Sequence, residues 1–308
     1  MKENWSKYFN VGTIHFMSFP EVMKGEGPIL ETLEKILAND FFTAVEITRI
    51  KDDDVREEAR KMLQSSHIVA AYGAQPVLLS NKLNINSLVE EERRKAVDEV
   101  KKCIDEAAFL GTKGVAVLSG VHPGKELEKE GIKKLIESLE ELCDYSQKYD
   151  LKFELETFDY DVDKKCLIGK SELAADVAKQ VRKKYSNFGL ILDLSHFPIQ
   201  YEKTEKALKN SIDYITHLHI GNCLLKDKNH PAYGDQHPRF GVEGGENDVE
   251  QVREFFSVLF DLGWLKKEGA KPGEKPIISF EVKPMAGEKS NIVLANSIRV
   301  FKEAWASL

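Results

Sequence analysis

Four ionisable residues end four short apolar segments in the second half of the 308-residue sequence. In chain order they are Glu156, Asp193, His219 and Glu281. Carboxylate oxygens and imidazole nitrogens are donor atoms that divalent metal ions take from proteins. Carboxylates are also rarely buried unless a partner or a cation neutralises them. If the fold brings these four side chains together, the sequence therefore predicts a site for one divalent cation.

At two of the four positions, a residue of the same type lies two residues earlier in the same segment and is an alternative metal ligand. Glu154 precedes Glu156, and His217 precedes His219, so each pair lies on one face of a predicted strand. We choose Glu156 and His219 as ligands because they lie nearer the carboxyl ends of their strands, and we treat Glu154 as a deeper supporting group. A single strand-end carboxylate also has simpler explanations, as a helix cap or a salt-bridge partner. A single histidine in a strand is more often a hydrogen-bonded core residue.

The segments that carry these residues belong to a regular alternation of apolar and amphipathic stretches. Apolar runs typical of strands buried on both faces lie at residues 11–16, 43–48, 68–73, 114–118, 151–156, 188–193, 214–220 and 276–281. Helical patterns lie at residues 28–39, 53–65, 87–110, 126–149, 171–184, 201–212, 248–262 and 290–306. This strict alternation predicts an α/β fold, a single-domain (β/α)8 TIM barrel over residues 1–308. Functional side chains of such barrels lie at the carboxyl ends of the strands.

An open doubly wound sheet is the alternative architecture, and the sequence disfavours it. Neither GxGxxG nor GxxxxGK[ST], the glycine-rich turns of nucleotide-binding sheets, occurs in the chain. Several predicted helix ends carry capping residues. Ser87 with Glu90 fits a capping box, and Ser171 and Asp248 are predicted N-caps. Gly111 is predicted to end the helix at residues 87–110.

Composition narrows the class of partner and the compartment. Lys and Arg number 44 and Asp and Glu 51, and the net charge of -7 disfavours broad binding to nucleic acid or to an anionic membrane. The four cysteines form no CxxC pair, so reduced thiols are the simpler expectation. The first residues lack the apolar core of a signal peptide, and no apolar run approaches the roughly 20 residues that span a bilayer. We expect a cytoplasmic protein without membrane contact, and homo-oligomerisation stays open.

Further polar residues near predicted strand ends are candidates for substrate binding. They are His15, Glu46, His196, Asp235, His237 and Arg239. His196 follows Asp193 by three residues, whereas the last three lie in the longest irregular stretch, residues 221–247. A long loop in a compact domain is more often functional than idle. For Glu46 a salt bridge, for His15 simple packing and for Arg239 plain solvation are the competing explanations.

The segments FELETFD, ILDLSH, ITHLHIGN, GVEGGEND and ISFEVKP resemble the signatures of strands five to eight in the xylose isomerase-like TIM barrel superfamily. That superfamily includes ketose epimerases, hydroxypyruvate isomerase-like proteins, inosose dehydratases and AP endonucleases. The resemblance implies that Glu156, Asp193, His219 and Glu281 bind the metal. It also implies that Glu156 and Glu281 exchange protons with the substrate, and that His196 contacts it.

One segment resembles the AP endonuclease branch instead. Asp235-Gln-His237 is similar to the segment with which those enzymes bind a further zinc ion. They also use histidines at the ends of strands three and four, where this chain has AAYGAQP and VLSGVHP. His122 lies beyond strand four in a different register, so we do not expect a complete trinuclear cluster. Whether Asp235 and His237 bind a second metal stays open.

The predicted ligand set indicates a class of chemistry. Three carboxylates and a neutral imidazole around a divalent cation sum to about -1, which suits neutral oxygen donors of a sugar or polyol substrate. An oxygen-rich set favours Mn²⁺ or Mg²⁺, with Co²⁺ or Zn²⁺ as alternatives. The predicted function is a metal-dependent sugar isomerase or epimerase, in which Glu156 and Glu281 abstract and return a proton through a metal-stabilised enediolate. The alternatives are an inosose dehydratase-like lyase, an AP endonuclease-like DNA repair enzyme and a non-enzymatic carbohydrate-binding protein.

Overall fold

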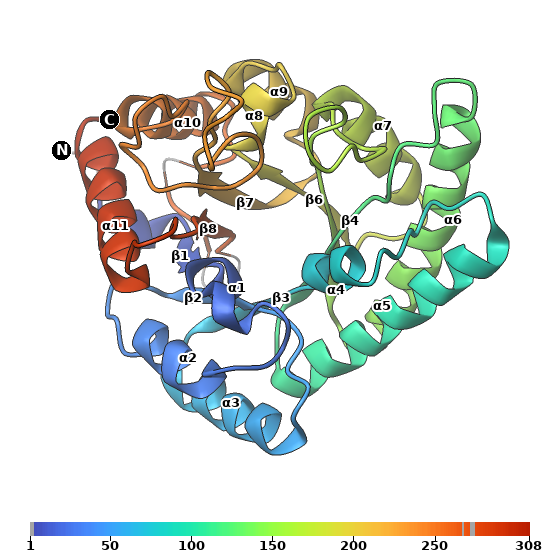
Figure 1. The fold of residues 1–308 in the computed structure, drawn as a ribbon, viewed down its shortest axis with the longest axis horizontal. Coiled ribbons are helices and arrows are strands. Elements are labelled where there is room, and N and C mark those ends of the chain that lie inside the picture. The colour runs from blue at the N-terminus through green and yellow to red at the C-terminus, as the bar shows by residue number, and fades with distance from the viewer. Residues whose placement is uncertain (1–2, 267, 272–274) are drawn as a thin grey trace.

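The computed structural model describes residues 3–266, 268–271 and 275–308. Within these ranges the strands are β1 (Asn10–Thr13), β2 (Ala44–Ile47), β3 (Val69–Gly73), β4 (Gly114–Leu118), β5 (Lys152–Glu156), β6 (Phe188–Asp193), β7 (Ile215–Gly221) and β8 (Ile277–Glu281). They form one parallel sheet in the order β1-β8-β7-β6-β5-β4-β3-β2. The predicted (β/α)8 barrel is confirmed, with the strands at the centre and the helices around them (Figure 1).

The barrel is nearly closed between β1 and β2, the first and last strands in the sheet order. The Thr43 N–H donates a hydrogen bond of 2.8 Å to the Val11 carbonyl oxygen, and Ile14 forms an isolated parallel bridge with Glu46. These contacts join β1 to β2, so the carboxyl ends of all the described strands surround one axis.

Eight longer helices, counted within the described ranges, surround the sheet (Figure 1). They are α2 (Ile29–Leu37), α3 (Asp53–Ser66), α5 (Glu90–Leu110), α6 (Glu128–Gln147), α7 (Ser171–Val181), α9 (Thr204–Ser211), α10 (Val249–Asp261) and α11 (Ser290–Ala306). Shorter elements are η1 (Trp5–Lys7), α1 (His15–Ser18), η2 (Pro20–Val22), α4 (Gln75–Ser80) and α8 (His196–Ile199). Among the described residues, no helix combines the length and the apolar character that crossing a membrane requires.

The hydrophobic core lies between the sheet and the outer helices, whereas the inside of the barrel is lined by small and polar residues. Aromatic rings such as Phe256 and Trp305 pack edge to face in the outer core. Inside, a Cβ atom on Gly12 would lie 2.8 Å from Ser279 Oγ, and one on Gly114 would lie 3.1 Å from Glu154 Oε2. Glycine at these positions therefore leaves room for polar side chains along the barrel axis. The four cysteines are buried and unpaired.

The predicted end of the first strand is wrong. β1 ends at Thr13, and residues 15–18 form the short helix α1 instead of continuing the strand. The Ser18 N–H donates to the Ile14 carbonyl at 2.9 Å, and the Ser18 hydroxyl lies 2.8 Å from that of Thr13. A short apolar run does not by itself distinguish a strand from a helical turn. His15 therefore lies in a helix beyond the strand.

Two of the predicted helix caps are wrong, and two helix ends are confirmed. α5 begins at Glu90 after Val89, and the Ser87 hydroxyl donates to the Glu92 carboxylate at 2.7 Å. Ser171 is the first residue of α7, where the Glu202 carboxylate accepts hydrogen bonds of 2.8 Å from its amide and from its hydroxyl.

The two confirmed ends lie on α10 and α5. Asp248 forms a full capping box with Gln251, in which the Asp248 carboxylate accepts from the helix and the Gln251 side chain accepts from the Asp248 amide. Gly111 ends α5 in the left-handed conformation, with φ of 75°. Both ends follow local chemistry alone, whereas Ser171 is bonded by a residue from a distant loop.

Candidate metal centre

The four predicted ligands converge at the mouth of the barrel. Glu156, Asp193 and Glu281 are the last residues of β5, β6 and β8, and His219 lies on β7 opposite Asp193 in the strand register. One donor atom from each side chain lies within 4.8 Å of the others. All four side chains are buried. Consecutive parallel strands thus deliver three carboxylates and one imidazole to a single point.

The imidazole of His219 is shared by two carboxylates. Its Nδ1 atom lies 3.0 Å from Glu156 Oε1 and 2.9 Å from Glu281 Oε2. Only the contact with Glu156 has hydrogen-bond geometry, and Glu281 Oε2 is buried with no hydrogen-bond partner. A single N–H cannot serve both oxygens, whereas a cation between the three atoms can. The donor set therefore fits a divalent metal ion.

Neutral donors orient the carboxylates of this centre. Gln75, at the start of α4, donates from Nε2 to Glu156 Oε2 at 2.7 Å. The Ser195 amide donates to Asp193 Oδ1 at 2.8 Å, and its hydroxyl donates to Asp193 Oδ2. Burial raises the pKa of Asp193. Burial lowers the pKa of His219, but Glu46 and Glu156 outweigh it and raise that pKa well above its ordinary value.

A second layer of charged side chains lies below the mouth, with members from β5, β7 and β2. His217 Nε2 lies 3.0 Å from Glu46 Oε1, and His217 Nδ1 lies 3.7 Å from Glu154 Oε2. The Thr216 hydroxyl donates to Glu154 Oε1 at 2.6 Å. Burial lowers the pKa of His217, but Glu46 and Glu154 raise it to about 9. We call Glu46, Glu154 and His217 the axial triad.

Glu46, predicted to bind substrate, contacts both histidines of the barrel axis. Its carboxylate oxygens also lie 3.2 and 3.3 Å from His219 Nε2, on the side of the ring opposite Glu156 and Glu281. Although burial alone raises it, the two histidines hold the pKa of Glu46 well below its ordinary value. Donor atoms of Glu46, His217 and His219 lie close enough together to form another group that could hold a metal.

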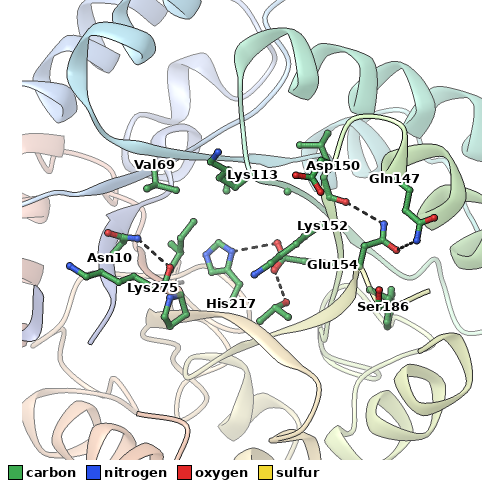
Figure 2. Close-up of a pocket in the computed structure, with 18 of the residues that line it drawn as sticks. Asn10, Val69, Lys113, Gln147, Asp150, Lys152, Glu154, Ser186, His217 and Lys275 are labelled. Carbon is green, nitrogen blue, oxygen red and sulfur yellow. Dashed lines mark hydrogen bonds and ion pairs between the residues drawn. The ribbon is translucent and has the colours of Figure 1, made fainter. Parts of the chain in front are cut away.

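A cavity of about 910 Å³ opens at the amino-terminal end of the barrel (Figure 2). Asn10, Lys113 and Lys275 line it, and it reaches Glu154 and His217 of the axial triad. None of the four mouth ligands lines this cavity. The cavity therefore belongs to the opposite end of the barrel from the candidate metal centre.

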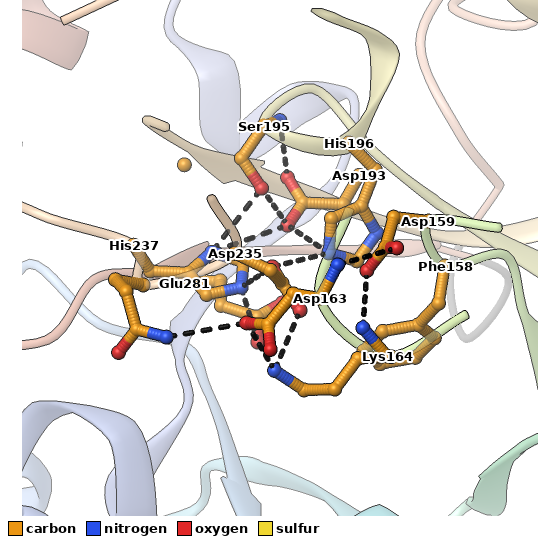
Figure 3. A network of polar contacts seen from close by, with 12 residues as sticks. Phe158, Asp159, Asp163, Lys164, Asp193, Ser195, His196, Asp235, His237 and Glu281 are labelled. Atoms are coloured by element: carbon orange, nitrogen blue, oxygen red, sulfur yellow. Dashed lines mark hydrogen bonds and ion pairs between the residues drawn. The ribbon is translucent and has the colours of Figure 1, made fainter. Parts of the chain in front are cut away.

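Three more predicted residues form a second cluster at the mouth, beside Asp193 and Glu281 (Figure 3). Asp235 Oδ1 lies 3.1 Å from His196 Nε2 and 2.7 Å from His237 Nε2. The His237 ring lies 3.6 Å from Asp193 Oδ2 through Nδ1 and 3.5 Å from Glu281 Oε1 through Nε2. Donor atoms of Asp193, His196 and His237 lie within 4.8 Å of one another. His196 begins α8, where a loop was expected.

Charge balance in this cluster depends on the histidines and on one lysine. Burial raises the pKa of Asp235, but His237, His196 and Lys164 together hold it well below its ordinary value. Burial lowers the pKa of His196, and Asp235 and Asp193 raise it well above the ordinary value. Lys164 Nζ lies 3.2 Å from Asp235 Oδ2.

Two residues predicted to bind substrate, His15 and Arg239, have their polar contacts outside both clusters at the mouth. His15 Nε2 lies 2.8 Å from the Thr32 hydroxyl in α2, and burial lowers the pKa of His15 to about 3. Arg239 donates from Nε to Glu288 Oε1 at 2.8 Å, and 37% of its side chain is exposed. A packing role for His15 and a surface ion pair for Arg239 account for these contacts.

Sequence reasoning missed Gln75, Ser195 and Lys164. Gln75 directly follows strand three, and Ser195 lies between Asp193 and His196, so their positions were available as signals. Lys164 lies in a loop with no distinguishing pattern. His122, beyond β4, lies 3.0 Å from Glu128 of α6 and belongs to none of the metal-competent groups found among the described residues.

Comparisons with known proteins agree with the fold. The inosose isomerase of Bacillus subtilis (strain 168) is 26% identical over 201 residues, which cover 61% of this chain and 70% of that protein. A solved D-tagatose 3-epimerase-like protein has a TM-score of 0.69 at 19% identity and covers 96% of this chain and 98% of its own. The IOLI protein solved with a binding zinc atom has a TM-score of 0.70 at 19% identity and covers 97% of each chain. The family model for the xylose isomerase-like TIM barrel matches residues 37–283, and the chain belongs to this family.

Proposed function

We propose that this chain is a divalent-metal-dependent isomerase or epimerase of a sugar or sugar derivative. The reaction would remove a proton from a carbon beside a carbonyl and return it. The observation that carries the proposal is the convergence of Glu156, Asp193, His219 and Glu281, with donor atoms within 4.8 Å of one another. Four ionisable groups from four strands, buried at a barrel mouth, are a costly arrangement without a cation.

These four residues would hold one divalent ion. The unpartnered oxygen of Glu281 and the His219 nitrogen shared by two carboxylates support this fit. The oxygen-rich donor set favours Mn²⁺ or Mg²⁺, with Co²⁺ or Zn²⁺ as alternatives. When bound, the ion supplies Lewis-acid polarisation of a substrate carbonyl, which acidifies the neighbouring C–H bond.

Glu156 and Glu281 are the proposed proton-transfer groups. They come from β5 and β8, with β6 and β7 between them, so their carboxylates approach the centre from different sides. One carboxylate would take the proton, and the other would deliver a proton. Delivery to the opposite face of the same carbon gives epimerisation, and delivery to the adjacent carbon gives aldose-ketose isomerisation. His196 and His237 lie beside this pair, where they contact Asp235, and would line the substrate site.

The relatives indicate which substrates to test first. The curated relative is named for an inosose, and the solved relatives include D-tagatose and L-ribulose 3-epimerases or proteins like them. Ketoses and cyclic keto-polyols share a carbonyl flanked by a carbon that carries a hydroxyl group. We propose this class, a neutral α-hydroxy ketone, as the substrate.

Solvent deuterium exchange tests the proposal. The Mn²⁺-loaded chain is incubated in D₂O with a panel of ketoses and inososes, and each sugar is examined by NMR and mass spectrometry. We expect deuterium at the carbon beside the carbonyl, in both recovered substrate and product. The Glu156→Gln and Glu281→Gln variants, folded by circular dichroism, should show no exchange. Sugar binding without exchange in the wild-type chain would sink the enzymatic proposal.

A lyase is the second candidate, because its first step is the same proton removal. The curated relative is named an inosose isomerase, so an inosose is the substrate on which the two reactions are compared. After proton loss, an inosose dehydratase-like enzyme expels hydroxide from the next carbon, whereas an isomerase returns the proton. Dehydration produces an absorbing enone or dione, so ultraviolet absorbance recorded during the inosose incubations separates the two outcomes.

A further inference from the structure

Lys164 places a positive charge inside the second cluster at the mouth (Figure 3). Its Nζ atom lies 3.2 Å from Asp235 Oδ2 and 3.0 Å from Asp163 Oδ2. Its side chain is 23% exposed, whereas that of Asp235 is 1% exposed. The half-buried ammonium group is held here by its two carboxylate partners.

The loop that presents Lys164 is built around one buried carboxylate. Asp159 follows β5 and accepts hydrogen bonds from the backbone amides of Val162, Asp163, Lys164 and Lys165, at 2.6 to 3.2 Å. Asp159 itself is fully buried. Four amides bound to one side chain give the loop a single conformation, so Lys164 reaches Asp235 from a defined position.

The cluster beside Lys164 has the composition of a metal site. Asp193, His196 and His237 could hold an ion, and Asp235 contacts both of these histidines through Oδ1. Asp235 directs its other oxygen at Lys164. A divalent ion bound at this cluster would share the Asp235 carboxylate with an ammonium group. Two cations that contact the same buried carboxylate repel one another strongly.

We propose that Lys164 takes the place of a second divalent ion, so that the chain binds one metal ion although its mouth offers donors for two. The inference rests on the proposed metal centre and adds to it the reason for a single ion. Lys164 supplies a fixed, covalently attached charge to Asp235, and with this charge in place His196 and His237 contact Asp235 instead of binding an ion.

The number of bound ions tests this inference without any activity assay. The metal-free chain is titrated with Zn²⁺, which favours histidine and carboxylate donors, and the ions bound per chain are counted by native mass spectrometry. We expect the wild-type chain to saturate at one ion. Lys164→Met keeps the length of the side chain but removes its charge, and we expect it to saturate at two.

Matched variants locate the second ion. Lys164→Arg keeps the charge and should bind one ion per chain. Lys165→Met, which removes the exposed neighbouring lysine, should also bind one. The double variant Lys164→Met with Asp235→Asn should return from two ions to one, because the proposed second site keeps Asp193 but loses the carboxylate that contacts both of its histidines.

The outcomes distinguish this inference from the proposed function. Two ions on the wild-type chain, or one ion on a folded Lys164→Met chain, would overturn the inference and leave the first centre standing. No ion on the wild-type chain would end the proposed function together with the inference. If Lys164→Met does not fold, Lys164→Gln, which also removes the charge but keeps a polar end group, takes its place with the same expected count of two ions.

Discussion

The barrel axis holds two layers of glutamate and histidine that come from alternate positions of the same strands. Glu156 and His219 belong to the mouth, and Glu154 and His217 lie two residues deeper. At the mouth, two of the three carboxylates contact the one imidazole, and Glu281 Oε2 has no hydrogen-bond partner. In the axial triad, one imidazole lies between two carboxylates, and Thr216 donates to one of them. Glu46 Oε1 and His217 Nε2 of the triad also have no partner of hydrogen-bond geometry, so the number of carboxylates is what differs between the layers.

This difference separates a candidate ligand set from a structural ion-pair network. Protonation of His217 leaves the axial triad with one net negative charge. The neighbouring His219 ring also contacts this triad, through the Glu46 carboxylate. Protonation of His219 cannot balance Glu156, Asp193 and Glu281 in the same way. Residue types alone do not separate the two layers. The two layers differ in their ratio of carboxylates to imidazoles and in their position along the strands.

The largest expected difference between the layers is in turnover. Glu156→Gln should lower the rate of solvent deuterium exchange by about 10³-fold or more, because a positioned general base contributes about 10² to 10⁴-fold. Glu154→Gln, the matched change one layer deeper, should stay within about tenfold of wild type. Rates are measured at saturating Mn²⁺, with metal content determined for each variant. Equal losses in both variants would contradict the separation of the layers.

The pH dependence of stability should report the axial triad. The pKa of His217 is raised to about 9 in the folded chain, above the ordinary value of about 6.5. Its contribution is therefore complete below pH 6.5 and is lost as the pH rises through 9, at most about 3 kcal/mol. Urea unfolding of the metal-free protein between pH 6.5 and 9 measures this loss. If the His217→Gln chain loses as much unfolding free energy over this pH range as the wild type, the loss belongs to other groups.

Metal addition should stabilise the mouth and not the deeper layer. At a Mn²⁺ concentration of 100 times the dissociation constant, the free energy of unfolding should rise by about 2.7 kcal/mol. His219→Gln should lose this increment, whereas His217→Gln should keep it. Denaturant unfolding with Mn²⁺ and with a chelator gives the comparison. The reverse pattern would move the ion to the axial triad.

The smallest effect is expected at Thr216. Thr216→Val keeps the shape of the side chain but removes the hydroxyl that donates to Glu154 at 2.6 Å. Loss of a hydrogen bond to a charged group should cost about 1.5 kcal/mol of unfolding free energy. Deuterium exchange and metal affinity should stay within about twofold of wild type. A large loss of turnover would show that the axial triad takes part in the reaction.

The fold, and the convergence of four strand-end side chains, could be predicted because both follow from local patterns. Buried parallel strands are short apolar runs, and β4 (Gly114–Leu118) has the predicted bounds. A charged residue at the end of such a run must lie at the barrel mouth. The order of positions in β5 and β7 therefore places Glu156 nearer the mouth than Glu154, and His219 nearer than His217.

The remaining parts depend on contacts between distant loops, which no local pattern records. Lys164 reaches Asp235 because Asp159 folds its loop, and Gln75 reaches Glu156 from a short helix that was not predicted. The turn after Thr13 moved His15 away from the expected strand end. Each case involves partners far apart in the sequence, or a backbone conformation that apolar periodicity does not describe.

The most direct test is to locate the bound ion. Crystals grown with Mn²⁺ and measured near the manganese absorption edge give an anomalous difference map. We predict one peak, coordinated by Glu156, Asp193, His219 and Glu281. A peak among Glu46, His217 and His219, or no peak at the barrel mouth, would contradict the metal centre proposed for this chain.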